Sequence, residues 1–245
     1  MPPGALVCVR SASWREADMT LYFSHLRLAR NPSARALAVL LRPSEYGGRA
    51  SGERVSAQHH LLWSVFADSE ERKRDFLWRE ERDGSFLTLS ARPPLQSDLF
   101  QPHRIKSYAP DLAPGARLEF LLRANATRMK RGGKREDVVK APIDALEQSE
   151  RAERRMEIAS SAGKAWLEQQ GEKSGFRVIT AIAEDYRQLS LPRLGAIDRN
   201  AMTLGILDLS GHLEMTDPAL FLTNLAQGFG RAKSFGCGLM IIRRA

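Results

Sequence analysis

The chain has 245 residues, which suffices for one large domain or for two domains of about 100 residues each. Its 37 lysines and arginines against 29 aspartates and glutamates give a formal charge of +8, which predicts attraction to a polyanion without requiring one. Only two cysteines, far apart, argue against a disulfide framework and a zinc site, and no apolar run approaches the ~20 residues that span a bilayer. We therefore expect a soluble cytoplasmic protein without a metal or a membrane anchor.

The first eighteen residues differ from the rest of the chain. They contain proline, serine and arginine without hydrophobic periodicity, and their apolar piece, Ala5 to Val9, is shorter than the ~7–15 apolar residues of a signal peptide. We expect residues 1–18 to be a disordered extension, or the product of a start codon upstream of Met19, and to lie outside the fold.

Residues 19–109 show the order of elements of one ferredoxin-like unit. Apolar residues alternate with polar ones in the predicted strands, and Asp83-Gly84 between two apolar segments is a hairpin signal. In chain order we expect a strand at 21–28, a helical run at 34–41, an irregular loop at 44–53, a helix beginning near Val55, hairpin strands at 76–78 and 86–89, and a fourth strand at 105–108.

Residues 110–115, rich in proline, alanine and glycine, are expected to link this unit to a second one at 116–245. The pattern there predicts a strand at 117–124, a long amphipathic helix within 143–169, strands at 176–183 and 202–215, a helix at 218–227 and a last strand at 239–242. The predicted fold class is therefore α+β, with tandem ferredoxin-like (RRM-like) βαββαβ domains.

A glycine-rich segment, Gly228–Leu239, separates the last predicted helix from the last strand. It holds four glycines and the cations Arg231 and Lys233. Glycine reaches positive φ readily, so such a loop can bring backbone N–H groups close to a ligand. The two cations predict that this ligand is an anion. The alternative is a tight helix-to-strand connection whose glycines only serve packing.

A second basic segment, Arg123–Lys140, carries a cluster of cations around Gly132-Gly133. Glycines keep such a loop mobile, and its cations can follow the phosphates of a nucleic acid. A solvated surface loop is the competing interpretation. The cations of the cluster are Arg128, Lys130, Arg131, Lys134 and Arg135.

Histidine is the side chain best suited to proton transfer near neutral pH. Of the five histidines, we expect His25, His103 and His212 to be structural. His59 and His60 are adjacent on a predicted helix, where successive side chains point about 100° apart, so only one of them can face a given cleft. The pattern alone does not exclude that both are solvated.

Three ordered motifs carry a resemblance to a known family. They are Gly-x-Gly-x-x-Lys-x-x-Gly-x-Gly-Leu at 228–239, Arg123-Ala124-Asn125 after an apolar strand, and the stretch from His59 to Phe66 followed by Arg74-Asp75-Phe76-Leu77-Trp78. Together they resemble the CRISPR repeat-processing endoribonucleases of the CasE type, the RNA-cutting subunit of the Cascade complex. The likeness extends over roughly Met19 to Arg244.

The resemblance implies specific site residues. A family histidine four residues before a core aromatic corresponds to His59 before Trp63, with His60 in reserve, and Ser56 stands where the family tends to have a tyrosine. Tyr46 is a speculative substitute for that tyrosine, and Ala126 replaces the proline that usually follows the Arg-Ala-Asn motif. The RNA-binding residues it implies are Arg123, Asn125, Arg128, Lys130, Arg131, Lys134, Arg135, Gly228, Gly230, Arg231, Lys233, Gly236 and Gly238.

The chemistry that the resemblance implies is metal-independent cleavage of the repeat stem-loop in CRISPR precursor RNA. A ribose 2′-hydroxyl would attack the adjacent phosphate and leave a 2′,3′-cyclic phosphate and a 5′-hydroxyl, with no cofactor, and the protein would stay with its product among the other Cascade subunits. This hypothesis requires the helix carrying His59 to lie on the same side of the molecule as the glycine-rich loop. Two rivals remain: a non-catalytic RNA-binding subunit, and a small-molecule enzyme whose glycine-rich loop binds a phosphate.

Overall fold

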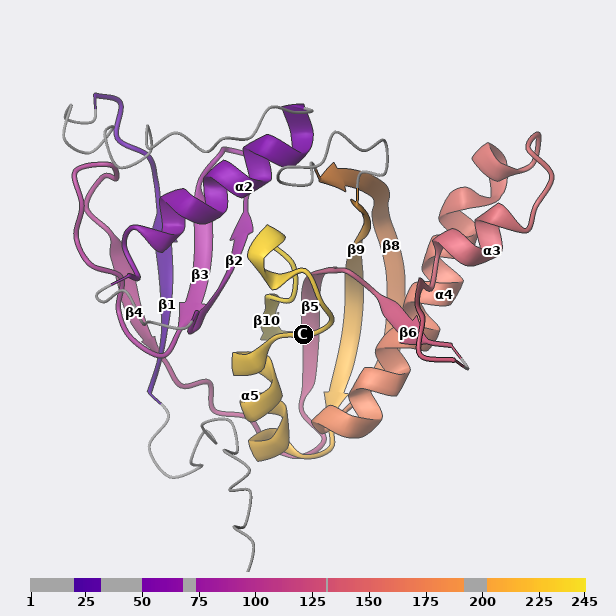
Figure 1. Cartoon of the computed structure of the whole chain (residues 1–245). Coiled ribbons are helices and arrows are strands. Elements are labelled where there is room, and N and C mark those ends of the chain that lie inside the picture. Colours follow the sequence, from indigo (N-terminus) through magenta and orange to yellow (C-terminus); the bar gives the residue numbers. More distant parts are fainter. Residues whose placement is uncertain (1–19, 32–49, 68–73, 131, 192–201) are drawn as a thin grey trace, which may run out of the picture.

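The computed structural model describes residues 20–31, 50–67, 74–130, 132–191 and 202–245. Figure 1 shows two β-sheets side by side, the N-terminal one in indigo to magenta and the C-terminal one in magenta to yellow. The predicted extension at 1–18, the helical run at 34–41 and Tyr46 lie outside the described residues.

The N-terminal sheet has the strand order of a ferredoxin-like unit. It contains β1 (Leu21–Leu26), β2 (Phe76–Glu80), β3 (Phe86–Ser90) and β4 (Arg104–Tyr108) in the antiparallel order β2-β3-β1-β4. The predicted hairpin and fourth strand are confirmed. Between β3 and β4, where such a unit usually has its second helix, residues 91–103 form an irregular segment. The Leu95 N–H of this segment donates a hydrogen bond to the Val65 carbonyl at 2.8 Å.

Helix α2 (Ala50–Trp63) begins earlier than predicted, so residues 50–53 of the loop expected at 44–53 are helical. A single interior glycine costs a helix only about 1 kcal/mol relative to alanine, so Gly52 does not stop it when the helix is packed. The beginning of α2 has such packing, since Val55 contacts an apolar cluster of Leu189, Ile206 and Cys237.

The C-terminal sheet is a complete βαββαβ unit. Its antiparallel order is β10-β5-β9-β8, and α4 and α5 cover one face (Figure 1). The predicted long helix at 143–169 is divided into a short α3 and a long α4, and a β6–β7 hairpin is inserted after β5. The elements are β5 (Arg117–Ala124), β6 (Thr127–Met129), β7 (Arg135–Asp137), α3 (Lys140–Asp144), α4 (Arg151–Ser174), β8 (Phe176–Leu191), β9 (Met202–Met215), α5 (Pro218–Gln227), the 3₁₀ turn η1 (Lys233–Phe235) and β10 (Met240–Arg244).

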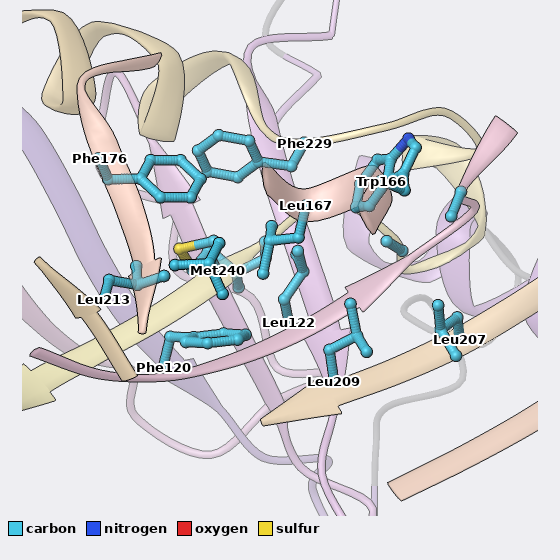
Figure 2. Close-up of a cluster of buried hydrophobic side chains, with 14 of the residues drawn as sticks. Phe120, Leu122, Trp166, Leu167, Phe176, Leu207, Leu209, Leu213, Phe229 and Met240 are labelled. Carbon is cyan, nitrogen blue, oxygen red and sulfur yellow. The ribbon is translucent and has the colours of Figure 1, made fainter. Parts of the chain in front are cut away.

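The side chains of strand β5 alternate between the two faces of this sheet. Its even-numbered residues are buried, while Leu121 on the other face is 44% exposed, as the alternation of a strand requires. Figure 2 shows Phe120 and Leu122 packed with Trp166 and Leu167 of α4 and with Phe229 from the glycine-rich segment. The core of the C-terminal unit therefore holds the start of that segment in place.

Helix α2 contacts both units, and this places the candidate site. Its last turn packs Leu61 and Leu62 against Trp78 and Phe86 of the N-terminal sheet, whereas its first turns contact β8 and η1 of the C-terminal unit. Residues in the middle of α2 therefore lie at the junction of the two units. Within the described ranges, no helix has the length and hydropathy needed to cross a membrane.

Candidate nucleic-acid interface

The glycine-rich segment between α5 and β10 folds back on itself and is tied to the end of β5. The Phe229 N–H donates to the Gly238 carbonyl at 2.9 Å. Gly238 in turn donates to the Arg123 carbonyl at 2.7 Å, and Arg231 to the Asn125 carbonyl at 3.3 Å. The backbone of the Arg-Ala-Asn motif is therefore the anchor of the glycine-rich loop, a link between two motifs that are more than 100 residues apart.

The glycines of this loop are needed for its shape. Gly236 has φ of +74°, and a Cβ there would lie 3.2 Å from the Trp78 ring of β2. Gly228 has φ of +78°, and a Cβ there would lie 2.7 Å from a Leu77 methyl group. The N–H groups of Gly228 and Gly238 are already bonded within the protein. These two N–H groups are therefore engaged within the fold, and ligand binding through the backbone stays a prediction for Gly230 and Gly236. The loop also offers side chains, notably Lys233 and Ser234 of η1 and the exposed Arg231.

His59 is half-buried, whereas His60 is exposed. The His59 ring stacks on Phe76 with centroids 6.2 Å apart and lies 6.1 Å from Trp63, and its Nδ1 is buried without a hydrogen-bond partner among the described residues. Burial first, then the positive charge of Arg74 and the neighbouring His60, lower the His59 pKa to about 4. The imidazole is therefore neutral at pH 7 and can accept a proton as a general base does, although its lowered pKa makes it a weaker base than an ordinary histidine.

Arg74 connects this histidine to the glycine-rich loop. Its Nη1 donates to the Ser234 hydroxyl at 3.0 Å, across 160 residues of sequence. Burial and then the charge of Arg74 lower the pKa of Lys233, so Arg74 lies near both His59 and Lys233. We call His59, Arg74, Lys233 and Ser234 the junction site. The required placement of α2 beside the glycine-rich loop is thus observed.

The predicted basic cluster at 128–135 forms the β6–β7 hairpin (Figure 1). Arg128 and Lys130 both pair with Glu136 of β7, so they are less available to a ligand than their charge suggests. Lys134 and Arg135 are exposed, and no carboxylate pairs with either in the described part of the chain. Arg131 lies outside that part.

Arg123 and Asn125, both predicted to bind RNA, form side-chain hydrogen bonds within the protein. Arg123 forms two hydrogen bonds with Asp208, at 2.8 and 3.0 Å, and lines a cleft of about 1370 Å³ between the two sheets. Asn125 is 4% exposed and donates through Nδ2 to the Gly205 carbonyl at 2.8 Å. Both side chains are engaged within the fold: Arg123 lies on β5 and lines the cleft, and Asn125 is buried directly after the end of that strand.

Two residues of the junction site were not identified as functional from the sequence. Arg74 belongs to one of the three motifs, but no pattern links it to a partner 160 residues away, and Ser234 carries no charge that would single it out. The structure also shows that Asp208 and Glu136 form ion pairs with two arginines that were predicted to bind RNA, Arg123 and Arg128. No group of three or more His, Cys, Asp or Glu side chains arranged to hold a metal ion occurs among the described residues.

The fold and the junction site define a protein with two ferredoxin-like units and a cationic site at their junction. The profile of the CRISPR-associated protein family matches residues 21–244. The chain therefore belongs to this family, and the predicted resemblance to the CasE type is confirmed.

Individual relatives agree with this assignment. The chain is 28% identical over 146 residues to the CRISPR-associated endoribonuclease Cse3 of Thermus thermophilus, an alignment that covers 56% of this chain and 60% of that protein. It is 26% identical over 193 residues to the Cascade subunit CasE of Escherichia coli, covering 74% and 88%. The structure of Cse3 bound to a 19-nucleotide RNA superimposes with a TM-score of 0.63 at 24% identity, covering 91% of this chain and 99% of that one, and it supports the fold.

Proposed function

We propose that this protein is a metal-independent endoribonuclease that cuts CRISPR precursor RNA at the 3′ base of the repeat stem-loop. Family membership and relatives named as an endoribonuclease and as a Cascade subunit support the reaction class and the RNA partner. The observation that carries the proposal for this chain is the junction site, where a neutral His59 lies near Arg74 and Arg74 in turn lies near Lys233.

In the proposed reaction, the RNA supplies its own nucleophile. His59 removes the proton from a ribose 2′-hydroxyl, whose oxygen attacks the adjacent phosphorus. The bond to the 5′-oxygen then breaks, and this oxygen takes a proton from solvent. The products are a 2′,3′-cyclic phosphate and a 5′-hydroxyl. Lys233 stabilises the negative charge that grows on the phosphorane, because such charge is greatest in the transition state.

The remaining cations serve binding. The β6–β7 hairpin leaves β5 directly after Asn125, whose carbonyl holds Arg231 of the glycine-rich loop. An RNA stem lying along the hairpin would therefore have one end near the junction site. Retention of the cut RNA and assembly with other Cascade subunits follow from the same proposal, supported by the name of the Escherichia coli relative.

The test is incubation of the full chain with a repeat-length RNA hairpin in EDTA. We expect a single cut, and no cut when the nucleotide before the break carries a 2′-deoxyribose. Metal dependence or cleavage of the deoxy substrate would contradict the mechanism. Tight binding without cleavage would instead favour a non-catalytic RNA-binding subunit, and equal binding of free nucleotides would favour a small-molecule enzyme.

The hairpin cations are expected to differ in their effect on RNA binding. Replacing Lys134 and Arg135 with glutamine should lower the slope of log K against log salt by about 1 for each phosphate that is no longer neutralised. Replacing Arg128 should have a smaller effect, because Glu136 already neutralises it. Binding of an uncleavable hairpin measured at several salt concentrations checks this order, and an equal change in slope for both sites would refute it.

A further inference from the structure

The junction site brings two cations close together. Arg74 and Lys233 are both partly buried, and Arg74 is close enough to lower the pKa of Lys233. No carboxylate pairs with either of them within the described residues, although Asp75, next to Arg74, is paired with Arg92. Like charges held together and partly desolvated are unfavourable unless an anion is bound between them.

The protein holds Arg74 in this unfavourable place by specific contacts. Its guanidinium is bonded to Ser234, the residue after Lys233, at 3.0 Å. Gly236, two residues further on, packs against the ring of Trp78, which lies four residues after Arg74. Two separate contacts therefore keep the segment before β2 and η1 together, which fixes the distance between the two cations.

From this arrangement we propose that Arg74, Lys233 and the Ser234 hydroxyl form a binding subsite for the scissile phosphate, with Arg74 as a direct phosphate-binding residue. The inference rests on the proposed function and assigns it a group outside the glycine-rich loop. A planar guanidinium can donate two parallel hydrogen bonds to phosphate oxygens, which a lysine cannot do. His59 on the adjacent face of α2 then lies beside the bound phosphodiester, where a 2′-hydroxyl would be presented to it.

The same arrangement gives Arg74 a second consequence. The charged or titratable groups near His59 are Arg74, from the segment before β2, and His60 on its own helix, and Lys233 of η1 lies near Arg74. Without RNA, burial first and then the charge of Arg74 keep the pKa of His59 low and the ring unprotonated. A bound phosphate offsets that charge, so the imidazolium that forms during proton transfer becomes easier to accommodate.

The experiment compares Arg74→Gln, Arg74→Lys and Ser234→Ala with Arg104→Gln, which removes an exposed cation on β4. Inorganic phosphate is titrated against each protein by NMR, and single-turnover cleavage of the RNA hairpin is measured at saturating protein. We expect Arg74→Gln to weaken phosphate binding at least fivefold and to lower the cleavage rate by about 10²-fold. Arg74→Lys should recover only part of the loss, Ser234→Ala should show a smaller loss than Arg74→Gln, and Arg104→Gln should behave as the unmodified protein.

A phosphorothioate at the scissile phosphate separates a direct contact from an indirect effect on the fold. One sulfur diastereomer should slow the unmodified protein, and this slowing should shrink in Arg74→Gln, whereas a variant that is only destabilised would keep it. If the unmodified protein cuts RNA and Arg74→Gln cuts it equally fast, with the same sulfur effect, the phosphate subsite is refuted while the nuclease function stands. If the protein never cuts RNA but binds phosphate through Arg74, the nuclease function is refuted while the phosphate-binding subsite stands.

Discussion

Replacing His59 with alanine is expected to lower the single-turnover rate of RNA cleavage by about 10²–10⁴-fold, the usual contribution of a positioned general base. Binding of a 2′-deoxy hairpin should change by no more than a few-fold, because proton transfer stabilises the transition state more than the bound ground state. Cleavage at saturating protein and binding of the deoxy RNA are measured separately.

The matched control is His60→Ala, one residue along the same helix but exposed. It should cleave at nearly the normal rate. A loss of cleavage in His60→Ala with normal activity in His59→Ala would mean that the two side chains exchange roles when RNA binds. Normal cleavage in both variants would remove the helix from the mechanism.

The titration of His59 gives an independent check of its surroundings. Its pKa is lowered to about 4, so the ring should stay neutral from pH 7 down to about pH 5 and gain its proton only below that. As the pH increases, kcat/KM should rise near pH 4, because it reports the pKa of His59 in the free enzyme. The rise in kcat should come at a higher pH, because bound phosphate favours the protonated ring. An NMR titration of the His59 ring without RNA, assigned with His59→Ala, measures the first value directly, and a midpoint near 6.5 would contradict the burial.

Replacing Gly205 with alanine is expected to destabilise the protein by about 1–3 kcal/mol, the usual cost of overpacking. A Cβ at this position would lie 1.6 Å from Asp137 Oδ2. That carboxylate cannot move away without loss, because its other oxygen accepts hydrogen bonds from the N–H groups of Val139 and Lys140. The variant should therefore unfold at a lower temperature and bind RNA more weakly through a displaced β6–β7 hairpin.

A double-mutant cycle with Asp137→Ala tests the cause of this loss. If the steric clash is responsible, the double variant should be more stable than the sum of the two single losses predicts. Additive losses would show that Gly205 matters for another reason. Gly133→Ala, in the open turn of the same hairpin at φ of +79°, should cost only about 1–2 kcal/mol of left-handed strain and leave the hairpin docked.

Local sequence pattern sufficed for most of the elements. The strand at 117–124 was predicted from its alternating apolar residues, and the strand at 202–215 and the helix at 218–227 also have the predicted bounds. These patterns repeat within one element, so neighbouring residues contain the information. The beginning of α2 was missed because its stability comes from contacts of Val55 with β8 and β9 rather than from its own glycine-containing sequence.

Site residues were predictable only where the chemistry of a single side chain carried the signal. The histidine pair and the basic glycine-rich segment could be found in this way, and the family resemblance selected His59. The pairing of Arg123 with Asp208 could not, because the two residues are 85 positions apart on different strands. The sequence does not reveal which cations the fold pairs with a carboxylate. Arg128 and Lys130 are further examples, because both pair with Glu136.

The amino-acid sequence by itself determined the two repeated units, the basic character and the membership of the chain in its family, since periodicity, composition and short motifs are properties of contiguous residues. Only the tertiary structure decided which cations are free and which histidine faces them. That choice depends on α2 crossing from one unit to the other and on the Arg74–Ser234 contact, and distances between remote segments exist only once the chain has folded.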